Sequence, residues 1–388
     1  MEVMMKELGE IITGNTPSKK TEEFWNSEDI CFVKPDIIAD NGVNEIVDSN
    51  EYISEDARKK ARVVGKNSIF VTCIGSIGKI GIASDGEYAF NQQINAIIPN
   101  DRVQPKYLAY NLLFNKPRLV AIANAPVVPI INKSQFGEFT VNIETDIDRQ
   151  CEIVDVLDKL TQIIQQRNKE ISALDDLIKA RFVEMFGTLH EDRFPKCTFR
   201  DVAHIKHGYA FSGEFFSEED NGVVLVTPGN FALGGGFQEV RNKYFTSEYP
   251  EEYVLHAGDL IVTMTDLSKK ADTLGYGAIV PNTDKIYLHN QRIGLFDKLD
   301  DRLNPVFVRW YMQTDEYRLE IVRTSTGSTV HHTSPDRILN SVIFIPPIEL
   351  QNEFAAFVQQ VDKSKVVVKK ALDETQLLFD SLMQQYFG

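Results

Sequence analysis

The stretches "RFVEMFG" (residues 181–187) and "LMQQYFG" (residues 382–388) both close with Phe-Gly, 201 residues apart. When residue n is laid over residue n + 201 from about Asn132 to Gly187, few residues are identical, but the apolar positions recur. Recurrence at a fixed offset is typical of a chain built from repeated units. The sequence therefore predicts an internal duplication.

The apolar residues that precede each Phe-Gly step by alternate fours and threes, which is the pattern of a coiled-coil seam. They are Ile153, Leu157, Leu160, Ile164, Ile171, Leu174 and Ile178, and then Phe354, Val358, Val361, Val368, Leu372, Phe379 and Leu382. Arg167, Arg181 and Lys365 interrupt the seam, and polar seam positions fix the register of a helix pair. We predict two long helices that form an antiparallel coiled coil; two helices of an ordinary globular core are the alternative. Apolar residues on the helix flanks are expected to face partner proteins: Ile163, Leu177, Phe182, Leu378 and Met383.

Each helix follows a region of short β-branched runs punctuated by Gly, Asn and Asp, which is typical of a mainly β module. Both regions contain an Asn-Gln-x-Ile stretch and then a helix opened by Pro105 or Pro305. The predicted fold class is α+β, with a pseudo-two-fold repeat of globule and helix. The expected segments are residues 1–144 and 188–345 for the two globules, and residues 145–187 and 346–388 for the central and C-terminal helices.

Composition indicates an ordinary soluble protein, with 43% hydrophobic and 25% charged residues. The longest apolar runs are broken by Gly, Pro, Asn or Lys before they reach the length of a membrane span. The opening "MEVMMKELGE" lacks the basic start and apolar run of a signal peptide. Four scattered cysteines fit neither a metal site nor a dense disulfide framework. We therefore expect a cytoplasmic protein.

The chain contains no motif that indicates catalysis. "GSIGKIG" (residues 75–81) lacks the first Gly and the Ser or Thr of a phosphate-binding P-loop, and "LGGGF" (residues 233–237) is not a dinucleotide fingerprint. HExxH, GxSxG and suggestive carboxylate pairs are also missing from the sequence. We expect a binding protein with no catalytic residues and no metal site.

Three polar loops are typical of contacts to nucleic acid. They are "TGNTPSKK" (13–20), "TDLSKKADT" (265–273) and "RTSTGSTVHHTS" (323–334). Hydroxyls, Lys and Arg position proteins on phosphates, whereas Asn, Gln and Arg can read base edges. The net charge of −15 argues against DNA at first sight, but it is spread along the chain and leaves room for a local basic face.

Taken together, the sequence resembles the specificity subunit of Type I restriction-modification systems over nearly its whole length. The resemblance rests on "LGEIITGNTPSKKTEEFWNSEDICFVKPDII" (8–38), "FVTCIGSIGKIGIASDGEYAFNQQINAII" (70–98), "IPPIELQNEF" (345–354) and "GSTV" (327–330). The first copy departs from this pattern. It has Thr145-Asp146 in place of the two prolines, although it keeps Gln150, and "APVV" (125–128) in place of "GSTV".

The resemblance implies a non-catalytic subunit that binds double-stranded DNA. Each globule would be a target-recognition domain that reads one half of a bipartite site, and the helices would fix the unspecified spacer. The implied partners are two modification subunits, which use S-adenosylmethionine to methylate adenine, and restriction subunits, which use ATP and Mg. No cofactor is expected in this chain. The alternatives are a protein-binding coiled-coil scaffold and, less consistent with the missing motifs, a methyltransferase or nuclease in its own right.

Candidate DNA-binding residues lie in both globules. In the first they are Thr16, Lys19, Lys20, Lys34, Ser76, Lys79, Asn91 and Gln92. In the second they are Tyr209, Ser268, Lys269, Lys270, Gln291, Arg292, Ser328, Thr329 and His331. The Asn-Gln pairs have an alternative role, since both copies retain them and such side chains also satisfy buried backbone groups.

Overall fold

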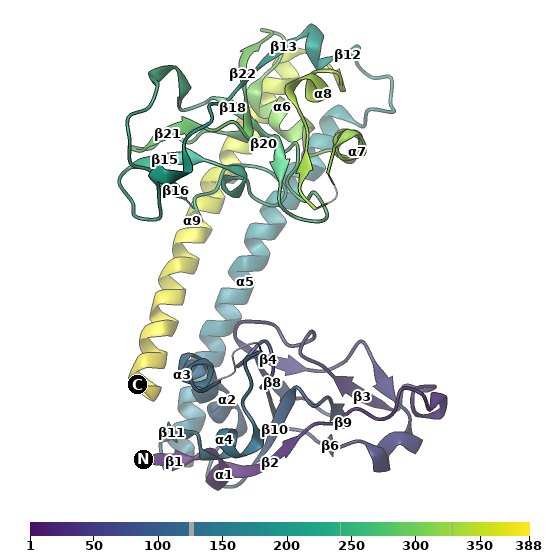
Figure 1. Ribbon diagram of the computed structural model, residues 1–388, viewed down its shortest axis with the longest axis vertical. Coiled ribbons are helices and arrows are strands. Elements are labelled where there is room, and N and C mark those ends of the chain that lie inside the picture. The colour runs from purple at the N-terminus through teal and green to yellow at the C-terminus, as the bar shows by residue number, and fades with distance from the viewer. Residues whose placement is uncertain (124–127, 241, 328) are drawn as a thin grey trace. The chain divides into compact units, whose positions relative to one another are not determined.

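The computed structural model describes residues 1–123, 128–240, 242–327 and 329–388 (Figure 1). The chain divides into two compact units, the first formed by Met1–Glu170 with Val368–Gly388 and the second by Ile171–Val367. Each unit contains one β-rich globule and one part of each of two long helices.

The two long helices are α5 (Ile147–Phe186) and α9 (Ile348–Phe387), each of 40 residues and offset by 201 at both ends. In the first unit, Leu157 near the start of α5 shares a core with Phe387 at the end of α9. In the second unit, Ile178 near the end of α5 shares a core with Phe354 near the start of α9. The helices are therefore antiparallel, and the predicted α+β fold with an antiparallel coiled coil is confirmed. None of the predicted seam residues is exposed.

Local chemistry explains where these helices begin and end. The carboxylate of Asp146 accepts a hydrogen bond from the Asp148 amide at 3.0 Å, and a negative group is favourable at a helix N-terminus. The α9 helix instead follows Pro346-Pro347, and proline is tolerated where a helix starts. Gly187 ends α5 with a φ of 70°, a left-handed conformation that glycine adopts without strain.

The repeated Phe-Gly closes each helix onto a globule. Phe186 packs against Phe307 of the second globule, with ring centroids 4.9 Å apart. Phe387 packs against Tyr107 of the first globule at 5.1 Å. Both closing phenylalanines are buried. The end of α5 therefore belongs to the second unit and the end of α9 to the first, which explains why the chain contains this stretch twice.

Two of the expected partner-facing residues are placed differently. Phe182 and Met383 are buried in the cores of the second and first units. The prediction for these two was wrong, because helical periodicity shows which face a residue occupies but not that a globule of the same chain covers that face. Ile163, Leu177 and Leu378 are exposed, as expected.

The globule of the first unit is built on a five-stranded sheet in the order β2-β10-β7-β8-β4 and a four-stranded sheet in the order β5-β3-β9-β6. A short pair, β1 with β11, lies at the helix entry. The strands are β1 (Glu2–Met4), β2 (Gly9–Thr13), β3 (Ile30–Val33), β4 (Val43–Ile46), β5 (Tyr52–Ile53), β6 (Val63–Val64), β7 (Ile69–Thr72), β8 (Ile80–Ala83), β9 (Tyr88–Phe90), β10 (Ile94–Pro99) and β11 (Thr140–Asn142). The helices are α1 (Met5–Leu8), α2 (Pro105–Phe114), α3 (Lys116–Ile122), α4 (Lys133–Glu138) and the 3-10 turns η1 (Glu22–Phe24) and η2 (Glu55–Lys60).

The globule of the second unit has a four-stranded sheet in the order β13-β22-β18-β20 and a five-stranded sheet in the order β14-β16-β15-β21-β17. The strands are β12 (Lys196–Thr198), β13 (Ala203–His207), β14 (Phe216–Ser217), β15 (Val223–Val226), β16 (Lys243–Phe245), β17 (Val254–Leu255), β18 (Leu260–Thr263), β19 (Thr265–Asp266), β20 (Gly277–Ile279), β21 (Ile286–His289), β22 (Ile293–Leu299), β23 (His331–His332) and β24 (Val342–Phe344). The helices are α6 (Pro305–Tyr311), α7 (Asp315–Thr324), α8 (Pro335–Leu339) and the 3-10 turns η3 (Phe199–Asp201), η4 (Gly213–Phe215), η5 (Pro228–Asn230) and η6 (Glu251–Tyr253).

The two globules share a central sheet. The order β2-β10-β7-β8 matches β13-β22-β18-β20, and every neighbouring pair in both sets is antiparallel. The second sheets also correspond, since β3 pairs parallel with β9 as β15 pairs with β21. The duplication predicted from the helices therefore extends to the globules.

A buried glutamine attaches each globule to its long helix. In the first unit, Gln150 accepts a hydrogen bond from the Gln104 amide at 2.7 Å and donates to the carbonyls of Arg102 at 3.3 Å and Glu144 at 2.7 Å. The side chain thus joins α5, the turn before α2, and the chain just ahead of α5.

Gln351 does the same in the second unit. It accepts from the Asn304 amide and donates to the carbonyls of Arg302 and Pro346, each at 2.8 Å. Gln150 and Gln351 are both fully buried.

Over the described residues, no helix has the length and hydropathy that a bilayer crossing requires.

Candidate nucleic-acid interface

Loops from distant parts of the chain meet at one end of the central sheet in each unit. The strand β10 runs antiparallel to both β2 and β7, so the loops after β2 and β7 lie beside the turn that precedes β10. Backbone hydrogen bonds hold this arrangement, from Gly14 to Ile94 at 3.0 Å and from Cys73 to Gln93 at 2.7 Å. We call residues 14–20, 73–79 and 91–93 the first loop end.

The corresponding second loop end comprises the described residues among 208–210, 264–275, 290–292 and 323–334. Its backbone repeats one contact of the first, since the Met264 amide donates to the Arg292 carbonyl at 2.9 Å. The pairing of β19 with β23 then places the loop of residues 323–334 beside that of residues 264–275. The first unit has a matching contact, since the Ile131 amide donates to the Cys73 carbonyl at 2.9 Å, as the Thr333 amide donates to the Met264 carbonyl at 2.9 Å. The shared scaffold thus presents loops in both units.

In each Asn-Gln turn, the two side chains have different roles. Asn91 and Asn290 are each only 7% exposed. Their side-chain oxygens accept hydrogen bonds from the amides two residues later, at 3.1 and 3.0 Å. The asparagines therefore shape the turn, whereas Gln92 and Gln291 are exposed at its tip.

Two glycines allow the neighbouring loop to approach this turn. A Cβ atom at Gly14 would lie 2.1 Å from the Asn91 carbonyl oxygen, and one at Gly208 would lie 2.1 Å from that of Asn290. These distances are too short for any side chain, so glycine is required at both positions. The close approach places Thr16 beside Gln92, whose side chains are hydrogen-bonded at 2.8 Å.

The lysines predicted as DNA contacts in the first globule differ in whether they pair with a carboxylate. Lys19 and Lys20 are both exposed. Lys19 and Lys34 lie 3.4 and 2.5 Å from the carboxylate of Glu51, whereas Lys20 has no carboxylate within 4 Å among the described residues. The hydrogen bond from Lys34 lowers the pKa of Glu51 and raises that of Lys34, so this pair stays charged at neutral pH. Their attraction for phosphate is partly offset by the carboxylate.

The loop after β7 holds the last two candidates of the first globule. Ser76 is exposed on this loop. Lys79 points back into the globule, where its ammonium lies 3.0 Å from Asp40 and donates to the Pro35 carbonyl at 3.3 Å. The structure therefore brings Ser76 to the first loop end and directs the Lys79 side chain away from solvent.

Sequence reasoning missed a basic segment beside the first loop end. The Asn15 side chain donates to the Lys60 carbonyl at 2.6 Å, and the Arg62 guanidinium donates to the Thr13 carbonyl. These bonds place exposed Lys59, Lys60 and Arg62 next to the loop after β2. The available signal was the basic run "RKKARVVGK" (58–66), which has the composition of an ordinary solvated face.

In the second unit, three predicted residues come together around one turn. The Tyr209 amide donates to the His289 carbonyl and the Gln291 amide donates to the Tyr209 carbonyl, both at 2.9 Å. The Tyr209 ring is 42% exposed and packs edge-on against Phe211. Gln291 and Arg292 are exposed beside it. An exposed aromatic ring next to an amide and a guanidinium suits contact with bases and phosphates.

The loop of residues 264–275 is organised by Asp266, which is buried. Its carboxylate accepts hydrogen bonds from the Ser268 amide at 2.6 Å and the Thr273 hydroxyl at 2.7 Å. Burial alone would raise the pKa of Asp266, but the hydrogen bonds from Thr273 and Ser268 together lower it. The ionised carboxylate thus holds a loop whose outer residues, Lys269 and Lys270, are exposed.

His331 connects this loop to the next one. Its Nε2 lies 3.3 Å from the Lys269 carbonyl oxygen, and its Nδ1 lies 3.4 Å from the Ser325 hydroxyl. Thr329 is exposed, and Ser328 lies outside the described residues. Exposed Arg323, in the last turn of α7, and exposed His332, in β23, flank this loop and were not predicted from the sequence as DNA contacts.

Both loop ends carry cations that the rest of the described chain does not neutralise. Within the described ranges, no carboxylate lies within 4 Å of the side-chain nitrogens of Lys20, Lys59, Lys60, Arg62, Lys269, Lys270, Arg292 and Arg323. The net charge of −15 therefore coexists with unpaired cations at both loop ends.

Comparison with known proteins decides the family. Residues 1–173 and 193–375 each match the family described as the Type I restriction modification DNA specificity domain. The chain belongs to this family. The two matched stretches also confirm the duplication inferred from the repeat.

Three relatives of this specificity-domain protein are named as Type I restriction enzyme specificity subunits. The HindI subunit of Haemophilus influenzae is 26% identical over 46% of this chain and 40% of its own length. The MjaVIII subunit of Methanocaldococcus jannaschii is 21% identical over 81% of this chain and 77% of its own. The EcoR124I/EcoR124II subunit of Escherichia coli is 28% identical over 46% of this chain and 48% of its own. The prediction of a specificity subunit, which is a non-catalytic component, is confirmed.

Solved structures agree on the fold. The S subunit from M. genitalium superposes with a TM-score of 0.58 at 15% identity, covering all of this chain and 96% of the other. A chain from a study of complex assembly and conformational transition of the type I R-M system gives 0.54 at 14% identity, covering all of this chain and 97% of the other. At these identities the similarity shows the fold alone.

Proposed function

We propose that this specificity subunit binds double-stranded DNA, and that each loop end reads one half of a bipartite site. The observation that carries the proposal is a repeated scaffold with different loops. Gln92 and Gln291 occupy the same tip in the two units, but their neighbours are Thr16 in one and Tyr209 and Arg292 in the other. Equivalent scaffolds with different side chains suit two different half-sites.

We further propose that α5 and α9 fix the length of the unspecified spacer. At ~1.5 Å per residue, a helix of this length spans about 60 Å. Polar contacts set the register of the pair, since Lys365 lies 2.6 Å from Asp175 and the Arg167 guanidinium donates to the Thr375 hydroxyl. A helix pair that cannot slip keeps a constant length.

The proposed partners are two modification subunits and, where the system restricts DNA, the restriction subunits. Exposed apolar side chains on α9 favour such docking, because Val366 and Val367 are each 68% exposed and Leu377 is 72% exposed. S-adenosylmethionine, ATP and Mg would be bound by those partners, with no cofactor in this chain. Since the substrate is the cell's own or incoming DNA, we expect the complex in the cytoplasm.

The test is to co-express the chain with the modification subunit encoded beside it and to map methylated adenines by single-molecule sequencing of the host genome. The proposal predicts one gapped motif with a methylated adenine in each half. An assembled complex that adds no methylation at any gapped motif would contradict it and favour the protein-binding scaffold. Gel filtration of the complex separates that result from a failure to assemble.

A further inference from the structure

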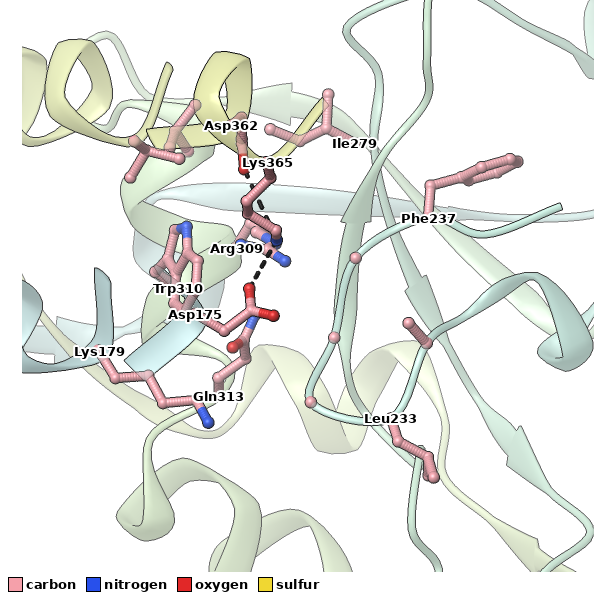
Figure 2. Close-up of a pocket in the computed structure, with 16 residues that line it drawn as sticks. Asp175, Lys179, Leu233, Phe237, Ile279, Arg309, Trp310, Gln313, Asp362 and Lys365 are labelled. Carbon is pink, nitrogen blue, oxygen red and sulfur yellow. Dashed lines mark hydrogen bonds and ion pairs between the residues drawn. The ribbon is translucent and has the colours of Figure 1, made fainter. Parts of the chain in front are cut away.

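A pocket of about 430 Å³ lies in the second unit, between α5, α6, α9 and the loop of residues 232–237 (Figure 2). Pockets for small molecules typically have volumes of ~300–1,000 Å³. Five charged side chains line it, namely Asp175, Lys179, Arg309, Asp362 and Lys365. The three cations and two carboxylates leave the lining with one net positive charge, which favours an anionic ligand.

Arg309 supplies the unused positive charge. Its guanidinium lies over the Trp310 ring, 4.2 Å from the ring centroid, and no described residue accepts a hydrogen bond from it. Burial lowers the pKa of Arg309 to about 10, so the group is still charged at neutral pH. Arg309 is half-buried, and an oxyanion in the pocket would give its guanidinium acceptors through two parallel hydrogen bonds.

The nearby carboxylates are already engaged by a different cation. Lys365 lies between them, 2.6 Å from Asp175 and 3.9 Å from Asp362, as the dashed lines in Figure 2 show. Burial raises the pKa of Asp362. Among the described residues, no carboxylate lies within 4 Å of the Arg309 guanidinium.

Neutral polar groups in the pocket are also unpaired. Both amide atoms of Gln313 and the Nε1 of Trp310 are buried without a hydrogen-bond partner among the described residues. Buried polar atoms in folded proteins nearly always have partners. The Gln313 amide offers one acceptor and two donors, which suits the edge of a polar ring.

A glycine-rich loop covers these side chains. Gly234, Gly235 and Gly236 all have left-handed φ values, of 85°, 84° and 95°. A Cβ atom at Gly235 would lie 2.5 Å from the Gln313 Nε2, and one at Gly236 would lie 2.7 Å from an Arg309 nitrogen. The bare backbone thus forms a wall against Arg309 and Gln313 that a side chain at either position would push away.

The first unit shows that the fold does not need these polar groups. At the matched positions of α2, Ala109 replaces Arg309 and Leu113 replaces Gln313. Tyr110 replaces Trp310, and its hydroxyl is satisfied by the Asp158 carboxylate at 2.7 Å. The first unit thus has apolar or hydrogen-bonded side chains at the three positions where the second unit has unpaired polar side chains. This difference indicates that the unpaired groups serve a ligand and are not required for folding.

We propose that this pocket binds a small molecule that carries an oxyanion and a hydrogen-bonding ring, a description that a nucleoside monophosphate fits. The oxyanion accepts from Arg309, the ring edge pairs with Gln313, and the glycine backbone lies close to the ligand. None of the residues that line the pocket belongs to the second loop end.

Isothermal titration calorimetry of the full-length chain tests the proposal, with the four common nucleoside monophosphates, adenosine and inorganic phosphate as probes. We expect one monophosphate to bind with a stoichiometry of one. Adenosine and phosphate alone should bind at least about tenfold more weakly, because each lacks one of the two recognised groups. Tight binding of phosphate alone would show a simple anion site and overturn the ring contact.

The variants Arg309→Met and Arg193→Met form a matched pair, since Arg193 is an exposed arginine that neither lines the pocket nor belongs to a loop end. The first should weaken binding at least about tenfold and the second should leave it unchanged. Gln313→Leu covers the case in which Arg309→Met does not fold. It should raise the midpoint of thermal unfolding without ligand, because it removes unpaired polar atoms, and should also weaken binding. Equal affinity in Arg309→Met or Gln313→Leu, or no binding of any probe at millimolar concentration, overturns the proposal.

Discussion

Gln150 and Gln351 lie 201 residues apart and make the same three backbone hydrogen bonds, one accepted and two donated. Each joins the start of a long helix to the turn before α2 or α6. A glutamine side chain is suited to this role because its amide both donates and accepts. Each globule is therefore attached to its long helix by an equivalent buried glutamine.

Replacing either glutamine by leucine should destabilise the protein strongly. Gln150→Leu or Gln351→Leu leaves a buried amide and buried carbonyls unpaired, at a cost of roughly 1–3 kcal/mol for each such group. Urea denaturation measures the free energy of unfolding. The control is Gln165→Leu on the exposed face of α5, for which a change within about 0.5 kcal/mol is expected. A loss no greater than that of the control would contradict the role given to these glutamines.

The lysines of the second loop end should act on phosphates and not on bases. Lys269→Ala combined with Lys270→Ala should weaken DNA binding by the assembled complex for all sequences alike, and should reduce the salt slope by about one unit per lost phosphate contact. Fluorescence anisotropy over a range of salt concentrations measures this slope. Lys285→Ala is the control, because Lys285 is paired with Glu239 at 3.2 Å and lies outside the loop end. A changed base preference in the double variant would show that these lysines read sequence.

Asp266 should stabilise its loop through its negative charge. Its pKa is lowered in the folded protein, so the stabilisation is fully present above the usual aspartate pKa of about 3.9 and is lost as the pH falls through the lower folded value. At neutral pH, Asp266→Asn should mimic protonation and accelerate hydrogen exchange of the Ser268 and Thr273 amides. Exchange rates for residues 14–20 of the first unit serve as the internal control. Unchanged exchange at both amides would show that the loop does not depend on this carboxylate.

The helices should behave as an adjustable spacer. Inserting seven residues at 170/171 in α5 and at 367/368 in α9 keeps the seam in phase and adds about 10 Å. The methylated motif should then gain about three base pairs of spacer with both half-sites unchanged, given about 34–36 Å for each 10–10.5 base pairs. An insertion in α5 alone is the control and should abolish methylation, because the two helices no longer match. An unchanged spacer in the double insertion would refute the ruler.

The sequence predicts the helices well and the surfaces less well, for physical reasons. The seam from Ile153 to Leu382 follows from local periodicity, which depends only on helix geometry. The burial of Phe182 and Met383 and the inward direction of Lys79 depend on residues far away in the sequence, and no local pattern reports them. The proposed roles of the individual loop residues stay predictions.

The role of the glycine-rich stretch "LGGGF" could not be predicted from the sequence either. It matches no phosphate-binding motif, and its role as a pocket wall appears only when Arg309 and Gln313 are seen beneath it. Arg62 likewise joins the first loop end only through its bond to the Thr13 carbonyl. Tertiary contacts between distant segments create both features.

The most direct test of the account is to compare the methylation motifs of two single variants, Gln92→Ala and Arg292→Ala, each co-expressed with the modification subunit. The two side chains are exposed on the tips of the first and second loop ends. Losing a bidentate base contact typically costs ~1–3 kcal/mol of discrimination at one position. Single-molecule sequencing should show that Gln92→Ala relaxes one half of the motif and Arg292→Ala relaxes only the other. If both variants relax the same half, or if each alters both halves, the claim that each unit reads its own half-site is contradicted.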